Sequence, residues 1–327
     1  MSAYNDACAA LALLIQDYRQ GELPAPDAAH VARWAEQFSE GVRLPILQEM
    51  MHVLGKSYFS KDKVLAFLKG VVTSKNLCGD DPKAFWQSTK ILQMQTQGNS
   101  QRELLQLFAE ELLGQTGLSL NDCGTAPQRF LYLDDGLFSG GRITSDLTQW
   151  VTDSAPATAK VYVVVIAAHA QGKYFTEKNI EKAAKAAGKN ISLKILYKFE
   201  INNRIFDDAK TDVLRPVSPG SDAAVKAYVS GLGKEQSWRK QQQQGALQFF
   251  SDEPARAMLE QEFLRAGVGI RLQCPYLNEY QRPLGNTTMR TTGFGTLFVT
   301  WRNCPNNAPL VLWAGDPWYP LFRRITN

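Results

Sequence analysis

The sequence lacks the features that mark secreted, membrane-spanning and zinc-binding proteins. Its five cysteines are odd in number and form no Cys-x-x-Cys pair, which favours reduced thiols over a disulfide framework or a zinc ribbon. No stretch approaches the roughly 18 apolar residues that a membrane span needs. The apolar residues 7–15 lie between Asp6 and Asp17 without a basic leader, which predicts a helix and not a signal peptide. We therefore expect a soluble, cytoplasmic protein without a membrane partner.

The sequence also has only a small excess of positive over negative charge. The net charge is +4 over 327 residues, and no block of like charge stands out. Such a balance permits a nucleic-acid partner without requiring one. The three histidines, His30, His52 and His169, are too scattered to form a metal set. We therefore expect no dedicated metal site.

The first 80 or so residues have helical periodicity. Pro26 and Asp27 suit a helix start, and Val31 and Trp34 fall on one face of the helix that follows. Further helices are predicted over residues 43–59 and 60–72. This group could be a helix-turn-helix reader of nucleic acid, but no helix has clustered Arg and Lys. We favour a helical docking or packing region, with its boundary near residue 84.

Strand and helix patterns alternate in the remainder, residues 85–327. Strands are predicted at 90–95, 130–133, 159–168, 191–201, 296–301 and 309–313, and helices at 102–113, 142–151, 176–188 and 252–267. A polar loop is expected at about 231–245. Alternation of this kind is typical of right-handed βαβ units. We therefore predict an α/β fold with a mostly parallel sheet.

Two adjacent acids, Asp134 and Asp135, end the apolar run at 130–133, and Ser139-Gly140-Gly141 precedes the next helix. Ligands bind at the carboxyl ends of parallel strands. Glycines let the backbone close around an anion, and a helix start carries partial positive charge toward it. Carboxylates suit hydroxyls or a metal. The segment thus predicts a site for a diol with a phosphate, such as ribose 5-phosphate; the alternative is a hairpin turn with an N-capping serine.

The pattern resembles the 5-phosphoribosyl-1-pyrophosphate (PRPP) loop of type I phosphoribosyltransferases. The resemblance implies that Asp134 and Asp135 bind the ribose hydroxyls and take part in catalysis. The phosphate cradle that it implies consists of Leu137, Phe138, Ser139, Gly140, Gly141 and Arg142. Arg142 departs from the family, which usually has Thr or Ser there. An arginine could bind phosphate bidentately, alter the ligand, or mark a site that no longer turns over.

Longer segments, 98–108, 259–271, 274–285 and 293–322, resemble a phosphoribosyltransferase-like family of bacterial conflict and anti-phage systems, some of whose members accompany retron reverse transcriptases. The resemblance runs from Val31 to the C-terminus. It implies a toxic effector enzyme that acts at ribose C1 of PRPP or a nucleotide, with Mg²⁺ carried by the phosphates. The implied partners are a reverse transcriptase with its RNA or DNA product, or other defence proteins. Alternatives are a non-catalytic module that binds a nucleotide or nucleic-acid end, and an adaptor that binds nucleic acid through the N-terminal helices.

Three further features are candidates for function. Residues 96–103 occupy the place of the family's pyrophosphate loop, with Gly98, Asn99, Ser100, Gln101 and Arg102 as donors, although Ser100 and Glu103 also form a capping-box pattern. His169 follows a buried strand and is either a general base or a hydrogen-bonded structural residue. The aromatic tail could stack a base, but we favour a core role for it. Its members are Trp301, Trp313, Trp318, Tyr319 and Phe322.

Overall fold

The computed structural model describes residues 2–94, 100–206, 210–240, 247–274 and 276–325. The chain forms two compact units, Lys61–Ile201 and the combination of Met1–Ser60 with Asn202–Asn327. This division differs from the boundary predicted near residue 84. Whether residues 1–84 form a separate region stays a prediction.

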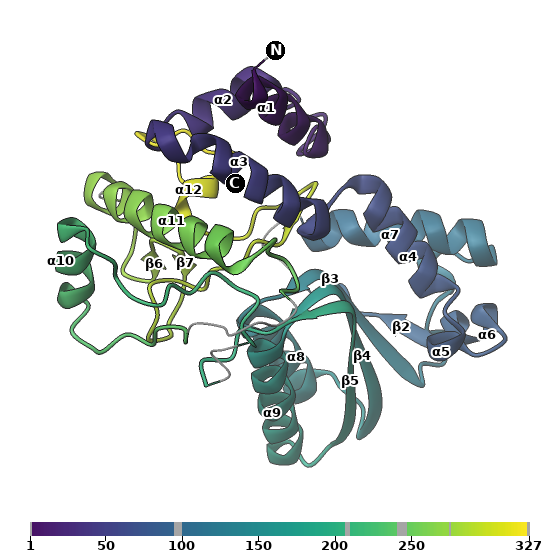
Figure 1. Cartoon of the computed structure of the whole chain (residues 1–327). Coiled ribbons are helices and arrows are strands. Elements are labelled where there is room, and N and C mark those ends of the chain that lie inside the picture. Colours follow the sequence, from purple (N-terminus) through teal and green to yellow (C-terminus); the bar gives the residue numbers. More distant parts are fainter. Residues whose placement is uncertain (1, 95–99, 207–209, 241–246, 275, 326–327) are drawn as a thin grey trace. The chain divides into compact units, whose positions relative to one another are not determined.

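The unit Lys61–Ile201 contains a four-stranded sheet with the order β2-β3-β4-β5, in which all neighbouring strands are parallel (Figure 1). The strands are β2 (Thr89–Ile91), β3 (Arg129–Leu137), β4 (Thr158–His169) and β5 (Asn190–Ile201). The helices are α4 (Lys61–Val72), α5 (Lys75–Cys78), α6 (Pro82–Gln87), α7 (Ser100–Thr116), the 3₁₀ helix η1 (Leu120–Asp122), α8 (Gly141–Asp153) and α9 (Ala170–Ala186). The α/β class with a mostly parallel sheet is therefore confirmed.

Helices α8 and α9 pack side by side and share one core with the sheet (Figure 1). Helix α8 places Ile143, Leu147 and Val151 in this core, with the spacing that the sequence predicted. Each buried aliphatic side chain of this size contributes about 1.5–3 kcal/mol relative to exposure. The burial fixes the rotation of α8, and so the direction of the loop that precedes it.

The side-chain alternation of β3 and β4 shifts by one residue near their carboxyl ends. Tyr132 and Leu137 of β3 both belong to the core under α8 and α9, as do Val165 and Ala168 of β4, although each pair differs by an odd number of positions. Because successive strand residues point to opposite faces, each strand has to break its alternation between these residues. The regular pleat of β3 is thus interrupted between Tyr132 and Leu137, a stretch that includes Asp134 and Asp135.

The second unit is mainly helical. Its helices are α1 (Ala3–Leu14), α2 (Ala28–Ala35), α3 (Glu40–Ser57), α10 (Ala223–Gly231), α11 (Glu253–Gln273) and α12 (Leu310–Trp313), and its short strands are β1 (Tyr58–Phe59), β6 (Gln281–Arg282), β7 (Gly285–Asn286) and β8 (Val299–Thr300). Asp27 caps α2 as predicted, since its side chain accepts a hydrogen bond from the backbone N–H of His30. The predicted strand at 309–313 is wrong. These residues form α12, in which all four side chains are buried, so no alternation distinguishes strand from helix.

The predicted polar loop follows α10, and its described part is anchored by a buried ion cluster. Arg239 pairs with Glu260 at 2.7 Å and with Glu253 at 2.6 Å. Arg256 pairs with the same Glu260 at 3.0 Å. Arg239, Arg256 and Glu260 are all almost fully buried. Although its composition is polar, the described part of this loop is attached to α11 by buried ion pairs.

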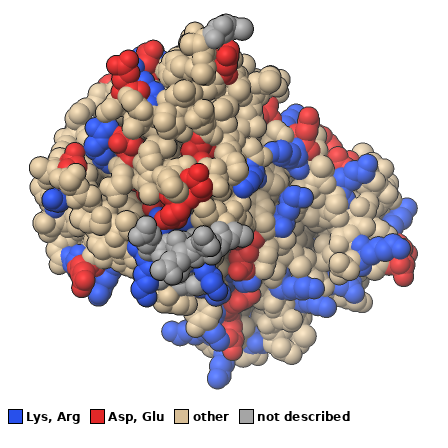
Figure 2. All heavy atoms as spheres, in the orientation of Figure 1, with Lys and Arg blue, Asp and Glu red and all other residues tan. Residues whose placement is uncertain are grey.

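Acidic and basic side chains are interspersed over the face shown in Figure 2, in keeping with the small net charge. None of the described helices combines the length and the apolar character that a bilayer span requires.

Candidate functional site

The two acids lie within β3 and not in a loop after it. The predicted strand ended at Leu133, whereas β3 continues to Leu137, because the backbone at Asp134 pairs with Val165 of β4 and that at Leu137 pairs with Ala168. The hairpin alternative is wrong, since β3 leads into α8 and both of its neighbours are parallel. The acids are therefore at the carboxyl end of a central strand.

Both carboxylates are largely buried, with Asp134 5% and Asp135 9% exposed. One oxygen of Asp134, Oδ1, accepts a hydrogen bond of 2.9 Å from the backbone N–H of Asp135. This bond orients the first carboxylate. Carboxylate oxygens are acceptors for hydroxyl and N–H donors, and each carboxylate can take part in about four hydrogen bonds.

The loop after the acids is shaped by a glycine with a positive φ. Gly140 has φ 78° and immediately precedes α8. A Cβ atom at this position would overlap the hydroxyl oxygen of Thr176 and the carbonyl oxygen of Gly172 in α9. Both the conformation and the space therefore require glycine here. The loop is held against α9 by backbone contact.

Helix α9 supports the loop at a second position. A Cβ atom on Gly172 would overlap the carbonyl oxygen of Phe138. The hydroxyl of Thr144 in α8 donates to that of Thr176 in α9 at 3.2 Å. Gly172 and Thr176 were not identified from the sequence, although a glycine in the first turn of a helix is a signal of close approach. Helix α9 thus supports the loop through close packing at Gly172 and Thr176.

The groups of the loop that reach the surface are polar. Ser139, Gly141 and Arg142 are exposed, whereas Gly140 is buried. The hydroxyl of Ser139 accepts a bond of 3.3 Å from the backbone N–H of Gly141, at the start of α8. Arg142 is the second residue of that helix. A helix start with an exposed hydroxyl and a guanidinium is suited to an anion.

His169 is the last residue of β4 and is completely buried. Its ring lies 5.3 Å from that of Phe138 in the loop. Burial lowers the pKa of His169 to about 3, against the effect of a hydrogen bond with the backbone of Leu137, so the imidazole is neutral. This geometry favours the structural alternative over a general base that exchanges protons with a substrate.

The predicted pyrophosphate loop is only partly described. Gly98 and Asn99 lie outside the described residues, as does the side chain of Ser100. Gln101 is buried, and its amide donates to the carbonyl of Leu133 at 3.1 Å, directly before the acid pair. Arg102 is exposed in the first turn of α7. The start of α7 is therefore joined to β3 beside the acids.

A cation that the sequence did not single out lies in the first turn of α9. Lys173 pairs with Glu200 of β5 at 2.7 Å and donates to the hydroxyl of Tyr197 at 3.2 Å.

Within the described ranges, no group of three or more His, Cys, Asp and Glu side chains is arranged to hold a metal ion.

A parallel sheet with an acid pair and a glycine loop between strand and helix is the arrangement of a phosphoribosyltransferase-like protein. The model of the PRTase-CE family matches residues 31–324, and the chain belongs to this family. The match begins at Val31, where the sequence resemblance was predicted to begin. No curated protein and no solved structure matches the chain.

Proposed function

We propose that Asp134, Asp135 and the loop 137–142 bind the ribose 5-phosphate part of PRPP or of a nucleotide, and that the protein is an enzyme acting at ribose C1. The observation that carries the proposal is that two buried acidic residues are followed directly by a loop that packs closely on α9. The packing leaves no space for a side chain at Gly140 or Gly172. Family membership supports a phosphoribosyltransferase-like activity.

In this proposal the two carboxylates accept hydrogen bonds from the ribose 2- and 3-hydroxyls. The N–H groups at the start of α8, the hydroxyl of Ser139 and the guanidinium of Arg142 bind the 5-phosphate. The backbone near Gly98, with Ser100 and Arg102, contacts the pyrophosphate. His169 we assign to positioning, because it packs on Phe138 inside the fold.

The proposed reaction breaks the bond between C1 and the leaving oxygen or base, and the electron pair departs with the leaving group. An acceptor forms the new bond to C1 and releases its proton. Positive charge develops on the ribose ring in the transition state, and two fixed carboxylates beside the diol stabilise it. Carboxylate oxygens also suit Mg²⁺, which would arrive bound to the phosphates and supply charge neutralisation.

The resemblance to conflict-system proteins extends the proposal to a role in anti-phage defence. On that basis the enzyme is a toxic effector restrained by partner components, among them a reverse transcriptase with its nucleic-acid product. The resemblance alone supports this step. Growth arrest on expression of the wild type, and its loss in the Asp134→Asn/Asp135→Asn variant, would support it.

The direct test is calorimetric titration of PRPP with Mg²⁺. We expect binding by the wild type and none by Asp134→Asn/Asp135→Asn. The matched control is Asp153→Asn/Glu177→Gln, which removes two exposed carboxylates of α8 and α9 in the same unit. Equal binding by the wild type and the acid-pair variant, or binding by neither, would remove PRPP as the ligand of this loop.

Arg142 supports a second candidate function, a module that binds a nucleotide without chemistry. The family's PRPP loop usually has a small hydroxyl residue at this position. Binding of a nucleotide without release of pyrophosphate or base would favour the module. Turnover in wild type and its loss in the acid-pair variant would favour the enzyme.

A further inference from the structure

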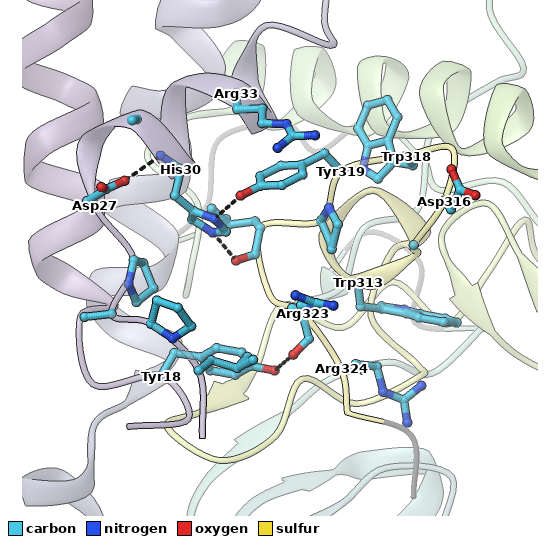
Figure 3. A pocket seen from close by; sticks show the side chains of 18 of the residues that line it. Tyr18, Asp27, His30, Arg33, Trp313, Asp316, Trp318, Tyr319, Arg323 and Arg324 are labelled. Atoms are coloured by element: carbon cyan, nitrogen blue, oxygen red, sulfur yellow. Dashed lines mark hydrogen bonds between the residues drawn. The ribbon is translucent and has the colours of Figure 1, made fainter. Parts of the chain in front are cut away.

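The unit formed by Met1–Ser60 and Asn202–Asn327 contains an open cavity of about 910 Å³ (Figure 3). Its walls come from α2 and the segment before it, and from the end of α12 with the aromatic tail that follows; Tyr276 also lines it. Cavities of roughly 300–1,000 Å³ are typical of sites for small molecules. All lining residues belong to this one unit, so the cavity shares no residue with the proposed PRPP site.

The aromatic wall is fixed by hydrogen bonds to α2, to Gln37 just after that helix, and to α12. The ring nitrogens of His30 bond to the hydroxyl of Tyr319 at 2.8 Å and to the carbonyl of Leu321 at 2.9 Å. The amide of Gln37 bonds to both the N–H and the carbonyl of Tyr319, each at 2.8 Å. Trp318 donates its ring N–H to the carbonyl of Val311 at 2.8 Å. Trp318 and Tyr319 are nevertheless only half-buried, so part of their ring surface remains accessible.

Three guanidinium groups line the same cavity. Arg33 lies over the Tyr319 ring, 4.0 Å from its centroid, and Arg324 lies over the Trp313 ring at 4.9 Å. Figure 3 shows Arg323 between Tyr18 and Trp313. Among the residues that the structure describes, none of the three arginines forms an ion pair with a carboxylate.

The two acidic residues of the lining offset only part of the charge of its three arginines. Asp27 uses its carboxylate to cap α2. Asp316 is the other acid of the lining and is exposed. Planar guanidinium groups bind phosphate bidentately, and aromatic rings stack on nucleobases. We propose that the cavity binds a nucleoside phosphate, either a free nucleotide or the end of a nucleic-acid strand.

An acidic peptide is the competing occupant, since it would also pair with arginines. The half-buried rings favour the nucleoside phosphate, because a flat base uses their surface and a carboxylate side chain does not. The two occupants differ in a measurable way. A nucleoside phosphate needs both its base and its phosphate, whereas a simple anion binds equally well without a base.

The test is calorimetric titration of the full chain that carries Asp134→Asn/Asp135→Asn, so that nucleotides cannot bind through the acid pair. The probes are AMP, adenosine, inorganic phosphate, and a short oligodeoxyadenylate with and without a 5′-phosphate. In this background, Arg323→Gln/Arg324→Gln removes two cavity cations. Lys226→Gln/Arg290→Gln is the charge-matched control, because both residues are exposed in the same unit and neither lines the cavity.

We expect AMP to bind more tightly than adenosine or phosphate. Its affinity should fall about 10-fold or more in the cavity variant, as for lost charge-assisted hydrogen bonds, and change less than about 2-fold in the control. Tighter binding of the 5′-phosphorylated strand than of AMP would support a strand end, and the reverse order would support a free nucleotide. The proposal would be overturned if neither AMP nor the oligodeoxyadenylate bound, or if their affinities were unchanged in the cavity variant. It would also be overturned if inorganic phosphate bound as tightly as AMP.

Discussion

Both units of the protein bury ionisable side chains, but the side chains that are buried together differ. In the unit with α11, Arg239 and Arg256 meet the carboxylate of Glu260, and opposite charges compensate one another inside the fold. In the sheet unit, two acidic residues, Asp134 and Asp135, follow one another in a single buried strand. Removing one member of a buried ion pair is costly, whereas carboxylates at the end of a strand are groups that can accept donors from a ligand. The comparison contrasts a cluster with a structural role with the acid pair for which we propose ligand binding.

The largest effect that we predict is on the ion cluster. Glu260→Gln keeps the shape of the side chain but leaves two buried guanidinium groups with too little negative charge. We expect a loss of about 3–5 kcal/mol in the free energy of unfolding, measured by denaturant titration. The control is Glu262→Gln in the same helix, whose partner Arg265 is a partly exposed i,i+3 neighbour at 2.5 Å. It should cost no more than about 1 kcal/mol. Similar losses in the two variants would contradict a structural role for the cluster.

An intermediate effect should come from His169, a buried basic group that carries no charge. Because its pKa is lowered to about 3 in the folded protein, it stays neutral where the imidazole of the unfolded chain takes up a proton, below about pH 6.5. The unfolded state then binds more protons, so stability falls as the pH falls from about 6.5 toward 3. The slope contributed by one group approaches about 1.4 kcal/mol per pH unit.

The measurement for His169 is denaturant unfolding at several pH values between about 7.5 and 5. His169→Gln should have a shallower pH dependence than the wild type, even if it is less stable at neutral pH. His52→Gln replaces an exposed histidine and should keep the wild-type slope. Parallel curves for wild type and His169→Gln would show that the imidazole is not held neutral by the fold.

The smallest effect on stability is expected for the acid pair itself. Asp134→Asn/Asp135→Asn keeps the size of both side chains, and an amide oxygen can still accept a hydrogen bond, so we expect stability without ligand to change by about 1 kcal/mol or less, in either direction. With PRPP at 100 times its Kd, only the wild type should gain about 2.7 kcal/mol. Thermal melts with and without PRPP measure both quantities. A loss above about 2 kcal/mol without ligand would mean that the carboxylates hold the fold together.

The sequence predicted what is local along the chain. The strand, acid pair, glycine loop and α8 occupy consecutive residues, and their hydrophobic pattern can be recognised in the sequence. The sequence did not predict that β3 continues through Asp134, because that extension depends on pairing with β4. Nor did it predict the support from Gly172, which comes from a different helix.

The aromatic tail shows the same limit. A core role was favoured for all five residues, and Trp301, Trp313 and Phe322 are indeed buried. Trp318 and Tyr319 instead line a cavity, and the position of Tyr319 is set by hydrogen bonds to His30 of α2 and to Gln37 just after it, almost 300 residues earlier in the chain. A short apolar run such as 310–313 is ambiguous for a related reason, since burial on all sides removes the period that would distinguish strand from helix.

The bonds between α2 and the tail also determine the order in which the protein can form during synthesis. The unit Lys61–Ile201 is one continuous segment, so it can fold while the ribosome is still translating the rest. Residues 1–60 are translated before the sheet unit, yet Trp34 and Gln37 have partners in Val311 and Tyr319. Assembly of that unit must therefore wait until residues 311–319 have been translated. A nascent chain can complete its sheet unit before it completes the unit that contains residues 1–60.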